Sequence, residues 1–175
     1  MITGCDSGFG NLLARRLDNA GFKVYACCLF ENGPGAKQLE SDCSSRLTIL
    51  KLDVTSDKDV DLVYRRVEKD LEESGYCKLN TSLMVNQWFK YYCLVLIFLC
   101  SALHAVVNNA GILSTGEIEF GQDIDSCEKQ ISVNCLGTIR VTKGFTPLLR
   151  RCKALPRLVN ITSMAARVSL PGKQS

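Results

Sequence analysis

Two hydrophobic patterns alternate along the chain. Apolar residues return every three or four positions in segments 11–20, 57–74 and 124–151, which predicts amphipathic helices. Between the helices stand short apolar runs typical of buried parallel strands, namely FKVYACCL (22–29), LTILKLDV (47–54), AVVN (105–108) and RLVNI (157–161). Strands that alternate with helices imply βαβ units. We therefore predict a Rossmann-like, doubly wound parallel sheet of the α/β class.

Single residues mark the apolar faces and the ends of the predicted helices. The first has Leu13, Leu17 and Ala20 on one face, and Gly21 ends it. The long helix 124–151 contains Pro147, which kinks it or marks its last turn. The stretch ENGPG (31–35) predicts a loop. The apolar face expected for the long helix consists of Ile131, Leu136, Ile139, Val141 and Leu148.

Composition narrows the choice of function. A chain of 175 residues with 46% hydrophobic and 22% charged residues is long enough for one domain with a core. The net charge of +3 is too small to indicate a nucleic-acid partner, and no nucleic-acid binding is expected. None of the ten cysteines forms a CxxC pair, and the one histidine, His104, has no ligand partner nearby in the sequence. No metal site is therefore predicted. We interpret the cysteines as reduced, small apolar side chains.

A glycine-rich turn opens the chain. Gly4, Gly8 and Gly10 in TGCDSGFG precede the first helix, where glycine lets backbone N–H groups approach a pyrophosphate. A glycine turn without a ligand is the alternative. Almost nothing precedes the turn, and the first strand is reduced to Met1 and Ile2. Because that strand is central in such a sheet, we expect the chain as written to be weakly stable.

Four further polar positions stand near the ends of predicted strands or inside the long helix. Asp53, with Val54, ends a strand and can accept a hydrogen bond from an adenine amino group; a helix cap or turn is the alternative. Asn108 opens the turn NNAG, Asn134 stands in mid-helix, and Ser163 follows the last strand. Their alternatives are a simple turn, a solvated polar position and a loop hydroxyl.

Taken in order, these stretches resemble one family. TGCDSGFG, LDVT, VVNNAG, SVNCLGT and LVNITSM together resemble the short-chain dehydrogenase/reductase family over residues 2–75 and 104–172. The stretches ITGCDSGFG, ENGPGA and TKGFTPLLRR are similar to the branch that contains the 17-beta-hydroxysteroid, 11-beta-hydroxysteroid, retinol and 3-hydroxybutyrate dehydrogenases.

The resemblance implies roles for single residues. Asn134 would support a proton relay through water, and Ser163 would hydrogen-bond the substrate oxygen. The family's catalytic Tyr and Lys would fall beyond Ser175. NAD is favoured over NADP, because Cys28–Phe30 offers no Arg for a 2′-phosphate and Glu31 can approach a ribose hydroxyl. The implied cofactor-binding residues are Gly4, Ser7, Gly8, Phe9 and Gly10 at the phosphates, Asp53 and Val54 at the adenine, and Asn108, Ala110 and Gly111 along the cofactor.

One segment does not fit this organisation. Residues 78–103 (KLNTSLMVNQWFKYYCLVLIFLCSAL) stand where a loop of about 2–6 residues is expected. We predict one partial dinucleotide-binding domain over residues 1–175, incomplete at its first strand and its C-terminal elements, with an anomalous apolar insertion at 78–103. Thymine-rich codons can encode its second half, which suggests an unspliced intron or a faulty gene model. A genuine membrane-associating insertion is the alternative, although the apolar part to Val107 is shorter than the ~20 residues of a membrane span.

Two hypotheses for function remain. The first is a fragment of an NAD(P)-dependent oxidoreductase of hydroxyl or keto groups on a hydrophobic steroid, retinoid or hydroxy acid. The second is a catalytically incompetent dinucleotide-binding or dimerising fragment without the Tyr/Lys pair. The resemblance also implies a homodimer through the long helices. For the compartment, it points to the endoplasmic reticulum membrane or the mitochondrion, and a fragment standing alone would be cytoplasmic.

Overall fold

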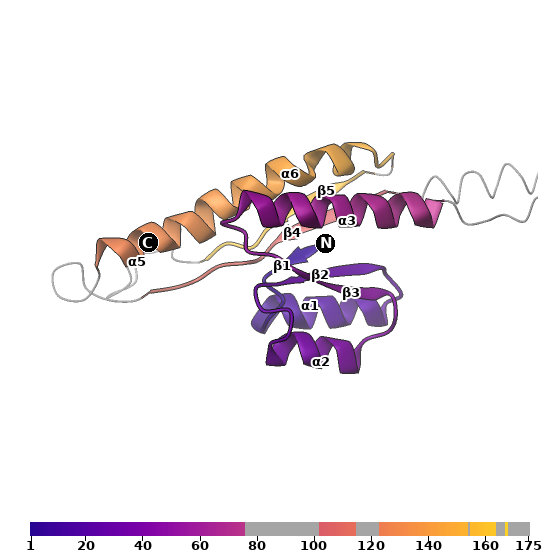
Figure 1. Ribbon diagram of the computed structural model, residues 1–175, viewed down its shortest axis with the longest axis horizontal. Helices are drawn as coiled ribbons and strands as arrows, with labels where there is room; N and C mark the ends of the chain where they lie inside the picture. The colour runs from indigo at the N-terminus through magenta and orange to yellow at the C-terminus, as the bar shows by residue number, and fades with distance from the viewer. Residues whose placement is uncertain (76–101, 115–122, 154, 164–166, 168–175) are drawn as a thin grey trace, which may run out of the picture.

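The chain forms an open parallel sheet between two helical layers (Figure 1). The computed structural model describes residues 1–75, 102–114, 123–153, 155–163 and 167. Its strands, in the order β3-β2-β1-β4-β5, are β1 (Ile2–Thr3), β2 (Val24–Cys28), β3 (Leu47–Lys51), β4 (Ala105–Asn108) and β5 (Arg157–Asn160). Its helices are α1 (Gly8–Asn19), α2 (Pro34–Asp42), α3 (Asp57–Gly75), α5 (Ile124–Gln130), a π-helix (Ile131–Gly137) and α6 (Thr138–Arg150). This arrangement confirms the predicted Rossmann-like sheet.

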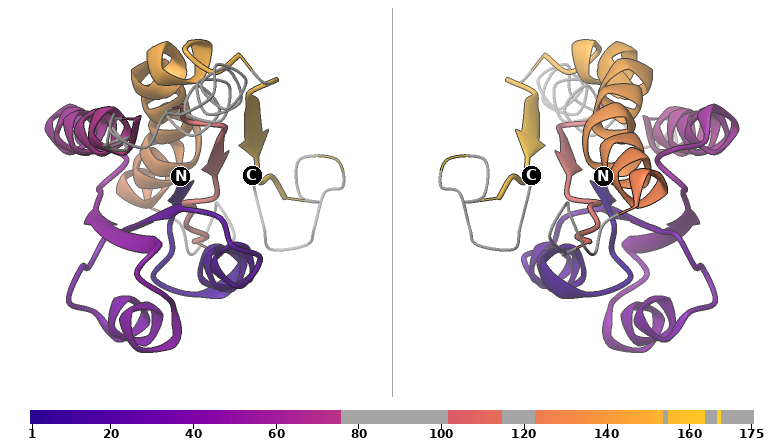
Figure 2. Two further views of the ribbon diagram at one scale, coloured as in Figure 1. Left: turned by 90° about the vertical axis from the view of Figure 1, so that its right-hand side faces the viewer. Right: turned by 90° about the vertical axis from the view of Figure 1, so that its left-hand side faces the viewer.

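Strand β2 shows how both faces of the sheet are buried. Every residue of β2 is buried, and successive side chains of a strand point to opposite faces. Val24, Ala26 and Cys28 join a core cluster under α1 and α2. Tyr25 and Cys27 join a second cluster under α3 and α6. Figures 1 and 2 show these helix pairs on opposite sides of the sheet.

The central strand β1 consists of two residues. It lies one residue later than the predicted Met1–Ile2, because Ile2 and Thr3 pair with Ala26 and Cys27 of β2. On its other side Ile2 pairs with Val107 of β4. Both halves of the sheet therefore meet at this short strand.

Helix α2 was missed by the sequence analysis. The predicted loop 31–35 was wrong at its last two residues, because Pro34 and Gly35 begin this nine-residue helix. Proline is favoured in the first turn, where its missing N–H is not needed. Of the nine residues, Ala36 and Leu39 are buried. Two buried side chains are too few to give a clear helical period in the sequence.

The predicted long helix is interrupted by π geometry. Val141 and Leu148 are buried as expected, but Ile131, Leu136 and Ile139 are 57%, 48% and 56% exposed. A π turn adds a residue to each turn, so positions spaced for an α-helix rotate away from the core. Pro147 lies within the last turn of α6.

The predicted insertion 78–103 lies outside the described residues up to position 101. Its last residue, Leu103, is 4% exposed and packs in the core cluster under α3 and α6. Among the helices that the structure describes, none is long and apolar enough to cross a membrane. In the same part of the chain no group of three or more acidic, Cys or His side chains is placed to hold a metal ion.

Phe145 of α6 joins the helical layer to the core. Its side chain is fully buried, and its ring centroid lies 6.0 Å from that of Tyr64 on α3. We expect Phe145→Ala to lower the free energy of unfolding in urea by about 3–5 kcal/mol, because it leaves a cavity. If that variant does not fold, Phe145→Leu should cost about 1.5 kcal/mol or less. Leu62→Ala, at an exposed site on α3, should cost no more than about 0.5 kcal/mol; equal losses at both sites would contradict this packing.

Asp18 ties the end of α1 to the segment before β3. Its carboxylate accepts hydrogen bonds from the Ser44 hydroxyl at 2.6 Å and from the Ser44 N–H at 2.8 Å. These bonds, more than the charge of Arg46, hold the pKa of Asp18 below its ordinary value.

A lowered pKa stabilises the fold above the ordinary pKa of an aspartate, about 3.9, and the stabilisation is lost as the pH falls through the lower folded value. We expect Asp18→Asn to lower the melting temperature at pH 7. The difference between variant and parent should shrink as the pH is lowered below about 4. A difference that stays constant with pH would show that the Asp18 charge has no part in it.

Candidate functional site

A cavity of about 840 Å³ opens at the carboxyl edge of the sheet. In open α/β sheets this edge is where ligands bind, and the volume is typical of small-molecule sites. The segments that follow β1, β2, β3 and β4 form its walls, together with parts of α5 and the π-helix. Eight residues that the sequence assigned to a cofactor line it, namely Gly4, Ser7, Gly8, Phe9, Asp53, Val54, Ala110 and Gly111.

Two glycines of the opening turn have positive φ. Gly4 has φ +68°, and a Cβ there would lie 2.7 Å from the Ala110 Cα. Gly8 has φ +59° and begins α1, and nothing lies within 4 Å of where its Cβ would be. The first turn of α1 therefore faces the cavity with its backbone uncovered, which is the geometry that favours an anion.

The remaining residues of the turn divide between cavity and core. Ser7 and Phe9 are exposed and line the cavity, and Phe9 is 80% exposed. Gly10 is buried behind the lining, because a Cβ there would lie 2.4 Å from the Gly4 carbonyl oxygen. The close approach of α1 to the turn thus requires a glycine at this position.

Asp6, which the sequence analysis did not single out, also lines the cavity. Its Oδ2 accepts a hydrogen bond from the Leu29 N–H at 2.9 Å, and its Oδ1 accepts one from the Phe30 N–H at 3.0 Å. These partners lie 23 and 24 residues later in the chain. Only the adjacency of β1 and β2 brings them together, so no local sequence signal could have identified this carboxylate.

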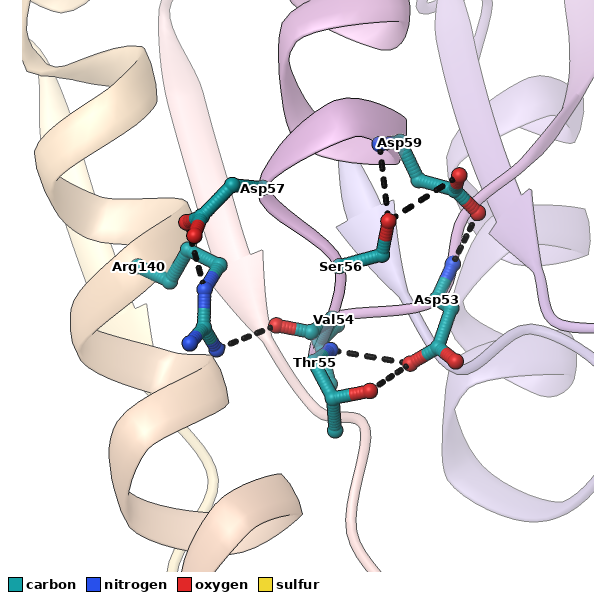
Figure 3. Close-up of polar contacts among 7 residues, drawn as sticks. All are labelled: Asp53, Val54, Thr55, Ser56, Asp57, Asp59 and Arg140. Carbon is teal, nitrogen blue, oxygen red and sulfur yellow. Dashed lines mark hydrogen bonds and ion pairs between the residues drawn. The ribbon is translucent and has the colours of Figure 1, made fainter.

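Asp53 and Val54 follow β3 in a hydrogen-bonded loop (Figure 3). Asp53 Oδ1 accepts hydrogen bonds from the Thr55 N–H at 2.8 Å and the Thr55 hydroxyl at 2.7 Å. Figure 3 shows the other Asp53 oxygen without a partner among the residues drawn. Arg140 on α6 donates to the Val54 carbonyl at 3.0 Å and to Asp57 at 2.7 Å. These bonds fix the loop at the cavity wall.

The wall after β4 depends on Thr3. The Thr3 hydroxyl accepts hydrogen bonds from the Asn109 N–H and the Ala110 N–H, each at 3.0 Å. Asn109, a second residue that the sequence analysis missed, donates from Nδ2 to the carbonyls of Thr3 and Gly4, also at 3.0 Å. The glycine turn and the NNAG turn are therefore held against each other by one cluster of short bonds.

Asn108 lies behind the cavity instead of in its lining. Its side chain is buried, and its Nδ2 donates to the Thr142 hydroxyl and to Asn160 Oδ1, each at 2.9 Å. Its Oδ1 is buried with no hydrogen-bond partner in the described part of the chain. The observed contacts join β4 to α6 and β5.

Asn134 lies in the π-helix and binds the segment after Gly111. Its Oδ1 accepts from the Ile112 N–H, and its Nδ2 donates to the Ile112 carbonyl, both at 2.8 Å. π-helical turns are frequent at functional sites. Ser163, beyond the carboxyl end of β5, is exposed and is not among the residues that line the cavity. The structure thus groups the predicted phosphate and adenine residues and places both predicted catalytic residues outside the lining.

Three buried thiols belong to the glycine turn and to β2. Burial raises the pKa of Cys27 and of Cys28 to about 12, and it raises that of Cys5 as well. A nucleophilic cysteine needs a lowered pKa, because the thiolate is the reactive form. These three side chains are neutral packing groups near neutral pH.

We expect Thr3→Val to lower the free energy of unfolding by about 1–3 kcal/mol, because the Asn109 and Ala110 N–H groups lose their acceptor while the volume is kept. Thr3→Ser keeps the hydroxyl and should recover most of that loss. Urea denaturation measures both variants. If the Val and Ser variants are equally stable, the hydroxyl does not hold the two turns together.

Comparison with known proteins identifies the family. The model of the short chain dehydrogenase family matches residues 1–90 and 96–175. Estradiol 17-beta-dehydrogenase 2 of Rattus norvegicus is 37% identical over 171 residues, which cover 96% of this chain and 36% of that protein. Mitochondrial D-beta-hydroxybutyrate dehydrogenase of Bos taurus is 36% identical over 97% of this chain and 42% of that protein. Retinol dehydrogenase 16 of Rattus norvegicus is 39% identical over 98% of this chain and 44% of that protein. The chain spans about two-fifths of the length of these relatives.

Solved structures agree on the fold. Serine dehydrogenase from Escherichia coli superposes with a TM-score of 0.70 at 22% identity, covering 98% of this chain and 64% of that one. Aldohexose dehydrogenase of Thermoplasma acidophilum gives a TM-score of 0.69 at 22% identity, covering 98% and 52%. Because the family model matches nearly every residue, we conclude that the chain belongs to the short-chain dehydrogenase family.

Proposed function

We propose that the chain is the dinucleotide-binding part of an NAD-dependent oxidoreductase that interconverts a hydroxyl group and a carbonyl group on a hydrophobic substrate. Membership of the short-chain dehydrogenase family supports the oxidoreductase class. The observation that carries the proposal is the cavity, into which the glycine turn, the Asp53–Val54 loop and the Ala110–Gly111 turn all project.

The glycine turn suits the pyrophosphate of the cofactor. Gly8 leaves open space in front of the first turn of α1, and backbone N–H groups at a helix N-terminus attract anions. Gly4 lets this turn approach Ala110, while Ser7 and Phe9 lie along the same wall. Gly10 supports the turn from behind. In this proposal the phosphates bind the backbone N–H groups of the turn, and Gly8 leaves the space in front of them without a side chain.

The other end of the cavity suits adenine. The Asp53 oxygen that has no partner among the residues drawn in Figure 3 can accept from the adenine amino group, and the Val54 side chain offers an apolar contact. Ala110 and Gly111 line the path between the two ends. When bound, the nicotinamide supplies or accepts the hydride. The chain's own residues orient the cofactor and exclude water from it.

Asn134 and Ser163 are proposed for the substrate side. Asn134 holds the Ile112 backbone through two bonds, and it keeps acceptor capacity for a water in a proton relay. Ser163, at the carboxyl end of β5, would hydrogen-bond the substrate oxygen. A steroid, a retinoid or a short hydroxy acid is the proposed substrate class, since relatives are named for estradiol, retinol and hydroxybutyrate.

The exposed apolar residues of the long helix support the proposed homodimer. Ile131, Leu136 and Ile139 are about half exposed on its surface, and a groove of about 630 Å³ lies between α3 and α6 beside two of them. Unpaired apolar surface of this kind is typical of subunit contacts.

Binding of NAD⁺ to the 175-residue chain, measured by isothermal titration calorimetry, tests the proposal. We expect Gly8→Ala to weaken NAD⁺ binding at least about tenfold, because a Cβ occupies the space in front of α1. The matched control is Gly21→Ala at the far end of α1. Gly21 has φ +89° and also has nothing within 4 Å of its Cβ position, so this variant likewise places a Cβ at a positive φ in open space.

Equal affinities of the two variants would overturn the assignment of the phosphate site, and no binding at millimolar NAD⁺ would overturn the function. The noncatalytic hypothesis predicts the same binding. It differs in turnover, which should be measured with a longer chain that continues past Ser175 and a panel of steroid, retinoid and hydroxy-acid alcohols.

A further inference from the structure

The carboxylate of Asp6 lies where the glycine turn meets the end of β2. It accepts the Leu29 N–H on one oxygen and the Phe30 N–H on the other. All three residues line the cavity, whereas Glu31, the acid expected at this position, is exposed and lies outside the lining. The acidic group beside the end of β2 therefore comes from the glycine turn and not from β2 itself.

The backbone of Asp6 is fixed on both sides by neighbouring elements. A Cβ on Gly35 would overlap the Asp6 carbonyl oxygen, so the start of α2 is packed directly on this residue. Asn11 Nδ2 donates to the carbonyls of Cys5 and Gly35 at 3.1 and 3.3 Å, which joins the turn to α2. The Cys5 N–H donates to the Cys27 carbonyl at 2.9 Å and fixes the turn to β2.

The hydrogen-bonding capacity of this corner favours a hydroxyl over a phosphate. Two successive N–H groups such as those of Leu29 and Phe30 would suit an anion, but Asp6 already occupies both. A carboxylate has about four acceptor sites, so Asp6 keeps sites for a hydroxyl donor. An ionised phosphate brings only acceptors and negative charge, which a fixed carboxylate repels.

The other charges of the cavity do not offset Asp6. In the described lining, the acids are Asp6, Asp53, Asp125 and Glu128, and the one cation is Lys129. Lys129 lies on α5 together with Asp125 and Glu128, on the wall formed by the long helix and not by β2. The corner at Leu29 and Phe30 thus presents a carboxylate with no lining cation from β2 or α2.

We propose that Asp6 is a specificity-determining residue that selects a dinucleotide whose adenosine ribose carries a free 2′-hydroxyl and rejects one that carries a 2′-phosphate. This inference rests on the proposed dinucleotide function and deepens it, since it names the group on the ligand that the site distinguishes.

The test is the ratio of dissociation constants for NADP⁺ and NAD⁺, measured by calorimetry on the 175-residue chain at low ionic strength. Asp6→Asn keeps the shape of the side chain and removes its charge. We expect this variant to lower the ratio about tenfold, mainly through tighter NADP⁺ binding. The matched controls are Asp125→Asn and Glu128→Gln, which remove a charge from the part of the lining that α5 forms and should shift both dissociation constants together.

A second measurement does not depend on the variant folding. Added salt screens charge repulsion, so the ratio for the unmodified chain should fall as NaCl is raised from about 50 to 500 mM. The role of Asp6 is overturned if the ratio in Asp6→Asn stays within twofold of the ratio in the unmodified chain. It is also overturned if the ratio falls as far in Asp125→Asn as in Asp6→Asn. In both cases the proposed NAD⁺ binding still stands. If the unmodified chain binds neither dinucleotide, the proposed function fails and this inference fails with it.

Discussion

The site depends on a two-residue strand at the centre of the sheet. Ile2 and Thr3 pair with β2 on one side, and Ile2 pairs with β4 on the other, so β1 alone sets where those two strands end relative to each other. Thr3 then adds a hydroxyl that accepts the Asn109 and Ala110 N–H groups. Because the glycine turn leaves β1 at this point, one cluster of bonds fixes two walls of the cavity at once.

Side chains that bind backbone groups hold the other walls. Asp6 binds the end of β2, Asn134 binds Ile112 after β4, and Arg140 binds the Val54 carbonyl after β3. Each polar side chain comes from one segment and fixes the main chain of another. The loops that line the cavity are therefore held in place before any ligand arrives. Such preorganisation limits the ordering that binding would otherwise require.

The sequence predicted the sheet well, because continuous apolar runs and the glycine and proline residues of loops are local signals. The bounds of β4 were predicted correctly, and eight of the implied cofactor residues line one cavity. Asp6 and Asn109 were not predicted because their hydrogen-bond partners lie 23 to 106 residues away in the sequence, and no local pattern reveals such contacts. Helix α2 was not predicted because its two buried residues, Ala36 and Leu39, are too few to show a helical period. The π-helix was not predicted because its period differs from the α-helical period used to find helices.

The pairing of Ile2 with Val107 has a consequence for how the chain folds. Strands β1, β2 and β3 and helices α1 and α2 can form from neighbours in sequence, as each βαβ unit closes a short loop. The bond from the Val107 N–H to the Met1 carbonyl closes a loop of more than 100 residues. Loop closure of that size is entropically unfavourable and slow, and high contact order correlates with slow folding. The N-terminal half would then collapse first, and the side of β1 that later pairs with β4 would be unpaired at that stage. The longer the segment between α3 and β4, the longer this unpaired strand edge would be exposed to pairing with other chains.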